Sequence, residues 1–178
     1  MPTPFARLKS LEELALRQAV GLPQREEVVQ YWTALAYRLG DETFVSPLEQ
    51  VTEVLPVPEI TRLPLAQPWV LGVVSRRGEL TPVFDFMGLV GRGVVSVTDS
   101  RARLVVVRLG SWSLALLVSE SLGLRHFQVD ARRPYEESAL ELKDFVVEEV
   151  VEPWRSWKML DLQKLLHGEA VLAVSALT

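Results

Sequence analysis

Hydrophobic and polar residues alternate in short runs from Trp32 onward, and this pattern predicts β-strands. Leu35, Tyr37 and Leu39 alternate with small or polar residues, and Gly40-Asp41 predicts a turn. Further short hydrophobic runs follow, separated by turn signals. Together they predict strands at 35–39, 43–45, 51–55, 69–74, 80–84, 104–109, 112–118, 122–129, 145–151 and 157–160. Many short strands at such spacing are typical of a barrel or a sandwich, so the predicted fold class is mainly β.

The segment from Leu104 to Leu117 contains few charged residues. It predicts a hairpin around Gly110-Ser111 whose strands are buried on both faces. Burial on both faces arises where two sheets or two barrels share one core.

The two ends of the chain have helical patterns instead. Ser10 and Glu13 have the spacing of a capping box, which predicts a helix that starts at Ser10 and ends near Gly21. The apolar face of this helix is expected to pack on the chain's own body, with docking to a partner as the alternative. A short second helical run is predicted over 24–30. A last helix is predicted to start after Asp161, a favourable N-cap residue.

Composition limits the class of protein. The chain has 178 residues, a net charge of −4 and no cysteine, so thiolate metal sites and cysteine nucleophiles are excluded. Hydrophobic residues make up 48% of the chain, which suits one folded domain plus an extension. No apolar run approaches the roughly 20 residues of a membrane-spanning helix, and the first residues lack a secretory pattern. We expect a cytoplasmic protein.

No group of reactive side chains marks an enzyme. The two histidines, His126 and His167, are far apart in the sequence, and no nucleophile motif surrounds any serine. We therefore expect no catalytic residue, no cofactor and no metal. A small hydrolase or ligand-binding barrel remains as an alternative, and a deep pocket with converging polar groups would favour it.

Several ordered segments resemble the CheW-like family. The segments are Val51-Thr52-Glu53-Val54-Leu55, Ile60-Thr61-Arg62-Leu63-Pro64, the run from Val70 to Phe86, and Trp157-Lys158-Met159-Leu160-Asp161-Leu162. The resemblance covers residues 37–166. The N-terminal extension, with Gly21-Leu22-Pro23 and Val29-Gln30-Tyr31-Trp32, is most similar to the PilI-type members, which serve type IV pilus twitching motility.

The resemblance implies a fold and a function. The fold would be two packed, SH3-like, five-stranded β-barrels in residues 32–178, preceded by a helical extension in residues 1–31. The function would be that of a non-enzymatic adaptor, monomeric or weakly self-associating. It would couple the cytoplasmic tip of a chemoreceptor to the regulatory domain of a CheA-like histidine kinase at membrane receptor arrays. A flagellar chemotaxis coupling protein is the alternative, and no nucleic acid or membrane insertion is expected.

The same resemblance implies the partner-binding residues, which are Val51, Glu53, Gly72, Arg76, Arg77 and Gly78. Glu53 and Arg77 are expected to approach each other, Gly78 to adopt a positive φ in a tight turn, and Gly72 to allow a close approach by a partner. Arg76 departs from the family pattern, which has leucine at this position, so the contact surface is expected to differ there.

Overall fold

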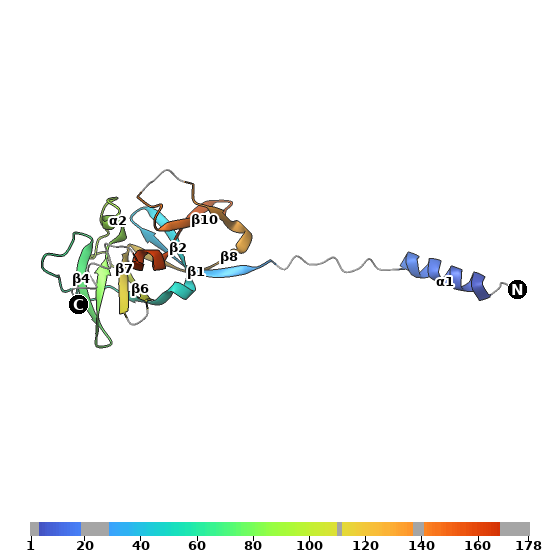
Figure 1. Ribbon diagram of the computed structural model, residues 1–178, viewed down its shortest axis with the longest axis horizontal. Coiled ribbons are helices and arrows are strands. Elements are labelled where there is room, and N and C mark those ends of the chain that lie inside the picture. The colour runs from blue at the N-terminus through green and yellow to red at the C-terminus, as the bar shows by residue number, and fades with distance from the viewer. Residues whose placement is uncertain (1–3, 19–28, 110–111, 137–140, 168–178) are drawn as a thin grey trace.

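The structure is a computed structural model that describes residues 4–18, 29–109, 112–136 and 141–167. Two β-sheets form the body, one on each side in Figure 1. The six-stranded sheet has the order β8 (Glu120–Gln128), β1 (Tyr31–Leu39), β2 (Glu42–Pro47), β11 (Arg155–Leu160), β10 (Val146–Glu152) and β9 (Arg132–Pro134). The five-stranded sheet has the order β3 (Val51–Pro56), β6 (Arg103–Leu109), β7 (Trp112–Val118), β5 (Glu79–Phe84) and β4 (Val70–Arg76). The prediction of a mainly β fold is confirmed.

Neighbouring strands are antiparallel except for two pairs. Strand β11 runs parallel to β2, and β5 runs parallel to β7. Each predicted strand run corresponds to an observed strand, with bounds that differ by a few residues. The predicted turn at Gly40-Asp41 joins β1 to β2, whereas the one at Gly110-Ser111 lies outside the described residues.

The larger of two hydrophobic cores lies between the sheets. Strands β6 and β7 supply its centre, and the residues from Leu104 to Val107 and from Leu114 to Val118 are 0–1% exposed. The predicted burial of this hairpin on both faces is therefore confirmed. Removing each such aliphatic side chain from water stabilises the fold by about 1.5–3 kcal/mol.

Strand β1 contributes to both cores. Leu35, Tyr37 and Leu39 enter the larger core, whereas Ala34 and Ala36 face the smaller one. The smaller core also contains Val45, Phe127, Val150, Trp157 and Met159. Small residues on one face of β1 thus leave room for the bulky aromatic rings of the smaller core.

A buried hydrogen-bond chain connects three strands of the six-stranded sheet. The Tyr37 hydroxyl lies 2.7 Å from Ser46 Oγ, which donates to the carbonyl oxygen of Leu160 over 2.7 Å. Ser46 donates its one hydroxyl hydrogen to Leu160, so the Tyr37 hydroxyl is the donor to Ser46 Oγ. Burial raises the pKa of the Tyr37 phenol, which stays neutral.

The N-terminal helix differs from its prediction. Helix α1 spans Pro4–Gln18, so Ser10 lies within it and is not an N-cap. Proline is favoured in the first helical turn, where its missing N–H costs nothing, and this explains the earlier start. Phe5, Leu8 and Leu14 are 79%, 67% and 53% exposed. The expected packing of this helix on the body is therefore not seen for these three side chains. Its end, and most of the predicted run 24–30, lie outside the described residues.

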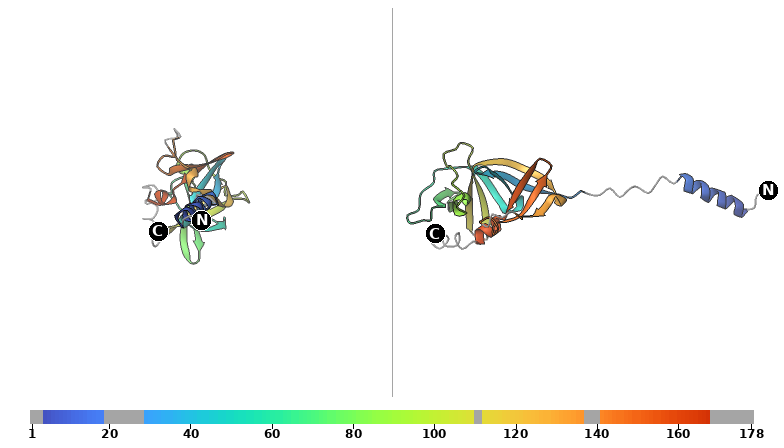
Figure 2. Two further views of the ribbon diagram at one scale, coloured as in Figure 1. Left: turned by 90° about the vertical axis from the view of Figure 1, so that its right-hand side faces the viewer. Right: turned by 90° about the horizontal axis from the view of Figure 1, so that it is seen from above.

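Three short helical elements lie near the sheets: α2 (Phe86–Leu89), α3 (Leu162–His167) and the 3-10 turn η1 (Leu48–Gln50). A second 3-10 turn, η2 (Val129–Ala131), precedes β9. Asp161 Oδ1 accepts from the amides of Gln163 and Lys164, which confirms its prediction as an N-cap. Figure 2 shows α3 beside the strands, where Leu162 and Leu165 enter the larger core.

Candidate partner-binding site

The turn between β4 and β5 is a two-residue hairpin turn. Arg77 has φ +52° and Gly78 has φ +85°, and Arg76 pairs with Glu79 on either side of them. Positive φ at both central residues is the geometry that matches the twist of paired strands. A Cβ atom at Gly78 would meet no atom within 4 Å. Glycine is therefore favoured at position 78 by backbone conformation and not by lack of space, and the predicted positive φ is confirmed.

Two arginines contact one carboxylate beside this turn. Arg76 Nη1 donates to Glu53 Oε2 over 3.1 Å, and Arg77 Nη2 donates to Glu53 Oε1 over 3.3 Å. The expected approach of Glu53 and Arg77 is thus observed, and Arg76 joins it. Arg76 also lies 3.4 Å from the hydroxyl of Ser113 on β7.

The three charged side chains differ in their contact with solvent. The Arg76 side chain is 12% exposed, that of Glu53 is 30% exposed, and that of Arg77 is 75% exposed. Solvent therefore screens the inner pair, Arg76–Glu53, less than the outer pair, Arg77–Glu53. The inner arginine is held within the protein and the outer one is presented to solvent.

The inner pair connects the two edge strands of the five-stranded sheet. Strand β3 carries Glu53 at one edge, and β4 carries Arg76 at the other. Neighbouring strands lie about 4.8 Å apart, so the edges of a flat five-stranded sheet would be about 19 Å apart. A 3.1 Å ion pair between edge strands therefore requires a strongly curved sheet.

Gly72 has a different environment from the turn. It is buried, has φ +140°, and a Cβ atom there would lie 2.2 Å from the carbonyl oxygen of Thr61. Thr61 and Val73 exchange two backbone hydrogen bonds, of 2.9 and 2.8 Å. The backbone that closely approaches Gly72 in this structure is therefore the chain's own.

The six predicted residues are thus partly brought together. Glu53, Arg76, Arg77 and Gly78 meet at one end of the curved sheet, and we call these four residues the arginine turn. Val51 starts the same strand as Glu53, beyond a bulge, and packs against the larger core. Gly72 lies on β4 away from the turn, where the backbone of Thr61 packs against it.

Sequence reasoning missed two residues near the arginine turn. Ser113 gave no signal, because its contact with Arg76 depends on sheet curvature. Leu80 is 65% exposed although it belongs to a hydrophobic run, whereas the next residue, Thr81, is buried. No signal in the sequence pointed to this, because the order of Leu80 and Thr81 in the hydrophobic run predicts the opposite burial.

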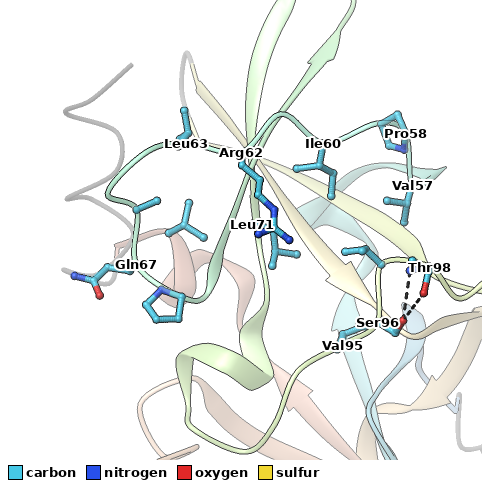
Figure 3. A pocket seen from close by; sticks show the side chains of 14 residues that line it. Val57, Pro58, Ile60, Arg62, Leu63, Gln67, Leu71, Val95, Ser96 and Thr98 are labelled. Carbon is cyan, nitrogen blue, oxygen red and sulfur yellow. Dashed lines mark hydrogen bonds between the residues drawn. The ribbon is translucent and has the colours of Figure 1, made fainter.

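A groove of about 620 Å³ lies on the five-stranded sheet's side of the molecule. The segment that connects β3 to β4 forms one wall, and residues 95–98 form the other. Its lining includes Val57, Ile60, Leu63 and Leu71, and Arg62 is its one charged lining residue. Figure 3 shows these side chains together with Ser96 and Thr98, which hydrogen-bond to each other. The polar side chains in this lining are Arg62, Gln67, Ser96 and Thr98, and no histidine, aspartate or glutamate is among the lining residues.

The charged residues that line a smaller crevice of about 220 Å³ include Arg38 of β1, Glu120 of β8, and Asp99 and Arg101 of the connection before β6. Arg38 lies 3.5 Å from Glu120, and Arg101 lies 3.0 Å from Asp99. Hydrogen bonds from Arg101 lower the pKa of the Asp99 carboxyl. A lowered pKa keeps the Asp99 carboxylate ionised near neutral pH, so it balances the charge of Arg101 and holds no proton to donate.

The remaining candidate groups for chemistry are dispersed. His126 Nδ1 lies 3.0 Å from the Thr33 hydroxyl on the exposed face of β8 and β1, and His167 Nδ1 lies 2.7 Å from the Gln163 carbonyl in α3. Within the described ranges, no three histidine, aspartate or glutamate side chains gather in a way that could hold a metal ion. The helices described in the structure include none long and apolar enough to cross a membrane.

Comparisons with known proteins identify the family. Residues 33–170 match the CheW-like domain, so the chain belongs to the CheW-like family. The protein PilI of Pseudomonas aeruginosa is 39% identical over 128 residues, which are 72% of this chain and 71% of PilI. FrzA of Myxococcus xanthus is 34% identical over 93 residues, 52% of this chain and 58% of FrzA. The predicted similarity to PilI-type members is confirmed.

A solved structure supports the same fold. The scaffolding protein TtCheW of Thermoanaerobacter tengcongensis superimposes with a TM-score of 0.71, over 79% of this chain and 96% of that one. Its sequence is 18% identical, so this similarity concerns the fold.

Proposed function

We propose that this chain is a signalling adaptor that couples a chemoreceptor to a CheA-like histidine kinase in the cytoplasm, at membrane receptor arrays. The observation that carries the proposal is the 39% identity to PilI over most of both chains, within the CheW-like family. The mechanism is scaffolding without turnover. The adaptor holds both partners, and a shift in the receptor changes the populations of kinase states.

The proposed pathway is type IV pilus twitching motility, because PilI is the more similar of the relatives described above. A flagellar pathway is the second candidate, since the chemotaxis protein CheW of Rhizobium meliloti is 31% identical over 94 residues. Deleting the gene distinguishes the two. Loss of twitching with normal swimming supports the pilus pathway, and the reverse contradicts it.

The proposed receptor contact is the arginine turn, together with Val51 and Gly72. The exposed charged side chain of Arg77 and the exposed apolar side chain of Leu80 lie on the same β4–β5 hairpin. Apolar contact surrounded by polar residues is the usual composition of a transient protein interface. Gly72 contributes by allowing the close packing of Thr61 against β4.

Titration with the regulatory domain of the cognate kinase tests the proposal. We expect the full chain to bind this domain with a dissociation constant of about 1 μM or lower, a binding free energy of about −8 kcal/mol. Matched titrations use a regulatory domain from an unrelated kinase pathway as control. Equal affinity for both domains, or no binding with both proteins folded, contradicts the proposal.

A further inference from the structure

The groove beside the five-stranded sheet leaves part of the larger core uncovered. Val57, Ile60, Leu63 and Leu71 pack against this core, are only partly buried, and all line the groove. On the opposite wall, the side chain of Val97 is 42% exposed. Figure 3 shows these two walls facing each other across the groove. Apolar residues that covered the groove would therefore extend the core and stabilise the chain.

The lining of the groove favours an occupant without charged side chains. Arg62 is the one charged residue among the described lining residues, and it is exposed, so its guanidinium can remain in water at the rim. The hydroxyl groups of Ser96 and Thr98 on the other wall can hydrogen-bond to the backbone of an occupant. A charged side chain placed between these walls would lose its hydration, which is unfavourable.

The chain itself contains a segment with the composition that this groove favours. Residues 170–177 read Ala-Val-Leu-Ala-Val-Ser-Ala-Leu, so seven of the eight are apolar and none is charged. They lie outside the described residues, and they follow α3, which ends at His167. Helix α3 packs Leu162 and Leu165 into the same larger core that the groove leaves partly uncovered. Segment and groove thus adjoin one core.

The segment is long enough to reach the groove from α3. Residues 168–177 span up to about 33 Å when the chain is extended. A folded body of about 140 residues is about 37 Å across. Because α3 and the groove wall pack on one core, they are separated by less than this full width.

Helix α1 is the competing occupant, since Leu8 and Leu14 are exposed. Its charge makes it less suitable, because Arg7, Lys9 and Glu13 lie within the same helix. A helix with its side chains is about 10–12 Å wide, so these charged residues would come close to the groove walls. The uncharged segment carries no such cost.

We propose that residues 170–177 bind in this groove of their own chain and cover it. The inference concerns the chain alone and goes beyond the adaptor function. A partner that binds in the groove then has to displace the segment first.

Disulfide formation tests the proposal, because the chain has no cysteine of its own. In the full chain, Ser96→Cys is combined in turn with Ala170→Cys, Ala173→Cys and Ala176→Cys. The matched control replaces Ser96→Cys by Ser156→Cys, an exposed position on β11 in the other sheet. A disulfide requires Cα atoms about 4.4–6.8 Å apart. We expect at least one pair with Ser96→Cys to form within one chain about tenfold faster than its control pair.

Thiol labelling gives a second measurement that does not depend on the exact register of the segment. Adding Leu172→Asp to the Ser96→Cys variant should raise the labelling rate of the thiol about tenfold, because a charged residue weakens the cover. The same change should not affect labelling of the Ser156→Cys variant.

Three results overturn the inference. The first is equal disulfide rates for groove and control pairs. The second is formation of disulfides only between chains, which identifies a second copy as the occupant. The third is labelling that Leu172→Asp leaves unchanged and Leu8→Asp accelerates, which identifies α1 as the occupant.

Discussion

Arg76 on β4 and Glu53 on β3 form a 3.1 Å ion pair between the two edge strands of one sheet. The curvature of the sheet brings the β4–β5 turn beside β3 and allows this pair to form. Arg77, which is next to Arg76 in the turn, contacts the same carboxylate from the solvent side. Structure and proposed recognition are connected through this one contact.

The two arginines of the turn are predicted to differ in their effect on stability. Arg76→Ala should reduce the free energy of unfolding by about 1–2 kcal/mol, because it removes packing and leaves Glu53 without its less exposed partner. Arg77→Ala should reduce it by about 0–1 kcal/mol, since its pair is exposed. Urea denaturation measures both. Equal losses would show that the inner pair has no special structural role.

Substitutions at two glycines separate lack of space from backbone strain. Gly72→Ala should cost about 3 kcal/mol or more, since the new Cβ would lie 2.2 Å from the Thr61 carbonyl oxygen in addition to the strain of a positive φ. Gly78→Ala should cost only about 1–2 kcal/mol, because its site is open and only the strain remains. Thermal unfolding of both variants measures the difference, and a Gly72→Ala protein as stable as Gly78→Ala would contradict the close approach.

The two hydroxyl groups of the buried hydrogen-bond chain, those of Tyr37 and Ser46, are predicted to contribute unequally to the stability of the fold. Ser46→Ala should destabilise the fold by about 2–3 kcal/mol, since it leaves both the Tyr37 hydroxyl and the Leu160 carbonyl without a partner. Tyr37→Phe should cost about 1 kcal/mol, because Ser46 keeps its bond to Leu160. Chemical denaturation of the two single variants tests this order, and the opposite order would refute the assigned donor direction.

The N-terminal helix is predicted to contribute little to the stability of the body. Phe5, Leu8 and Leu14 are exposed, so removing residues 1–18 uncovers no core through these side chains. The truncated chain should unfold within about 2 °C of the full chain. A midpoint lowered by several degrees would show that the helix covers part of the body in solution.

Local patterns in the sequence predicted much of the fold. Strand runs, the turn at Arg77-Gly78, the Asp161 cap and the buried β6–β7 hairpin all follow from neighbouring residues, and all are observed. The predicted start of α1 at Ser10 was wrong, because the helix begins at Pro4. Proline is favoured in a first helical turn, so Pro4 was the better signal for the start.

The candidate site was only partly predictable, because its geometry depends on contacts between distant strands. Glu53 and Arg76 meet through sheet curvature, which no hydrophobic alternation encodes. The role of Gly72 depends on Thr61, a residue outside the regular strands that bridges to β4. The family resemblance supplied these residues, and the structure distinguishes the exposed Arg77 from the inner Arg76.

The most direct test of the adaptor function is a reconstituted kinase assay. Autophosphorylation of the cognate kinase is measured with membrane-embedded receptor, with and without the full chain, and with Arg77→Gln and Arg125→Gln as matched variants. We predict that kinase activity depends on the receptor only when the chain is present, that Arg77→Gln weakens this dependence, and that Arg125→Gln, which changes an exposed residue of β8 in the other sheet, preserves it. Kinase activity that responds equally to the receptor with and without the chain would contradict the account.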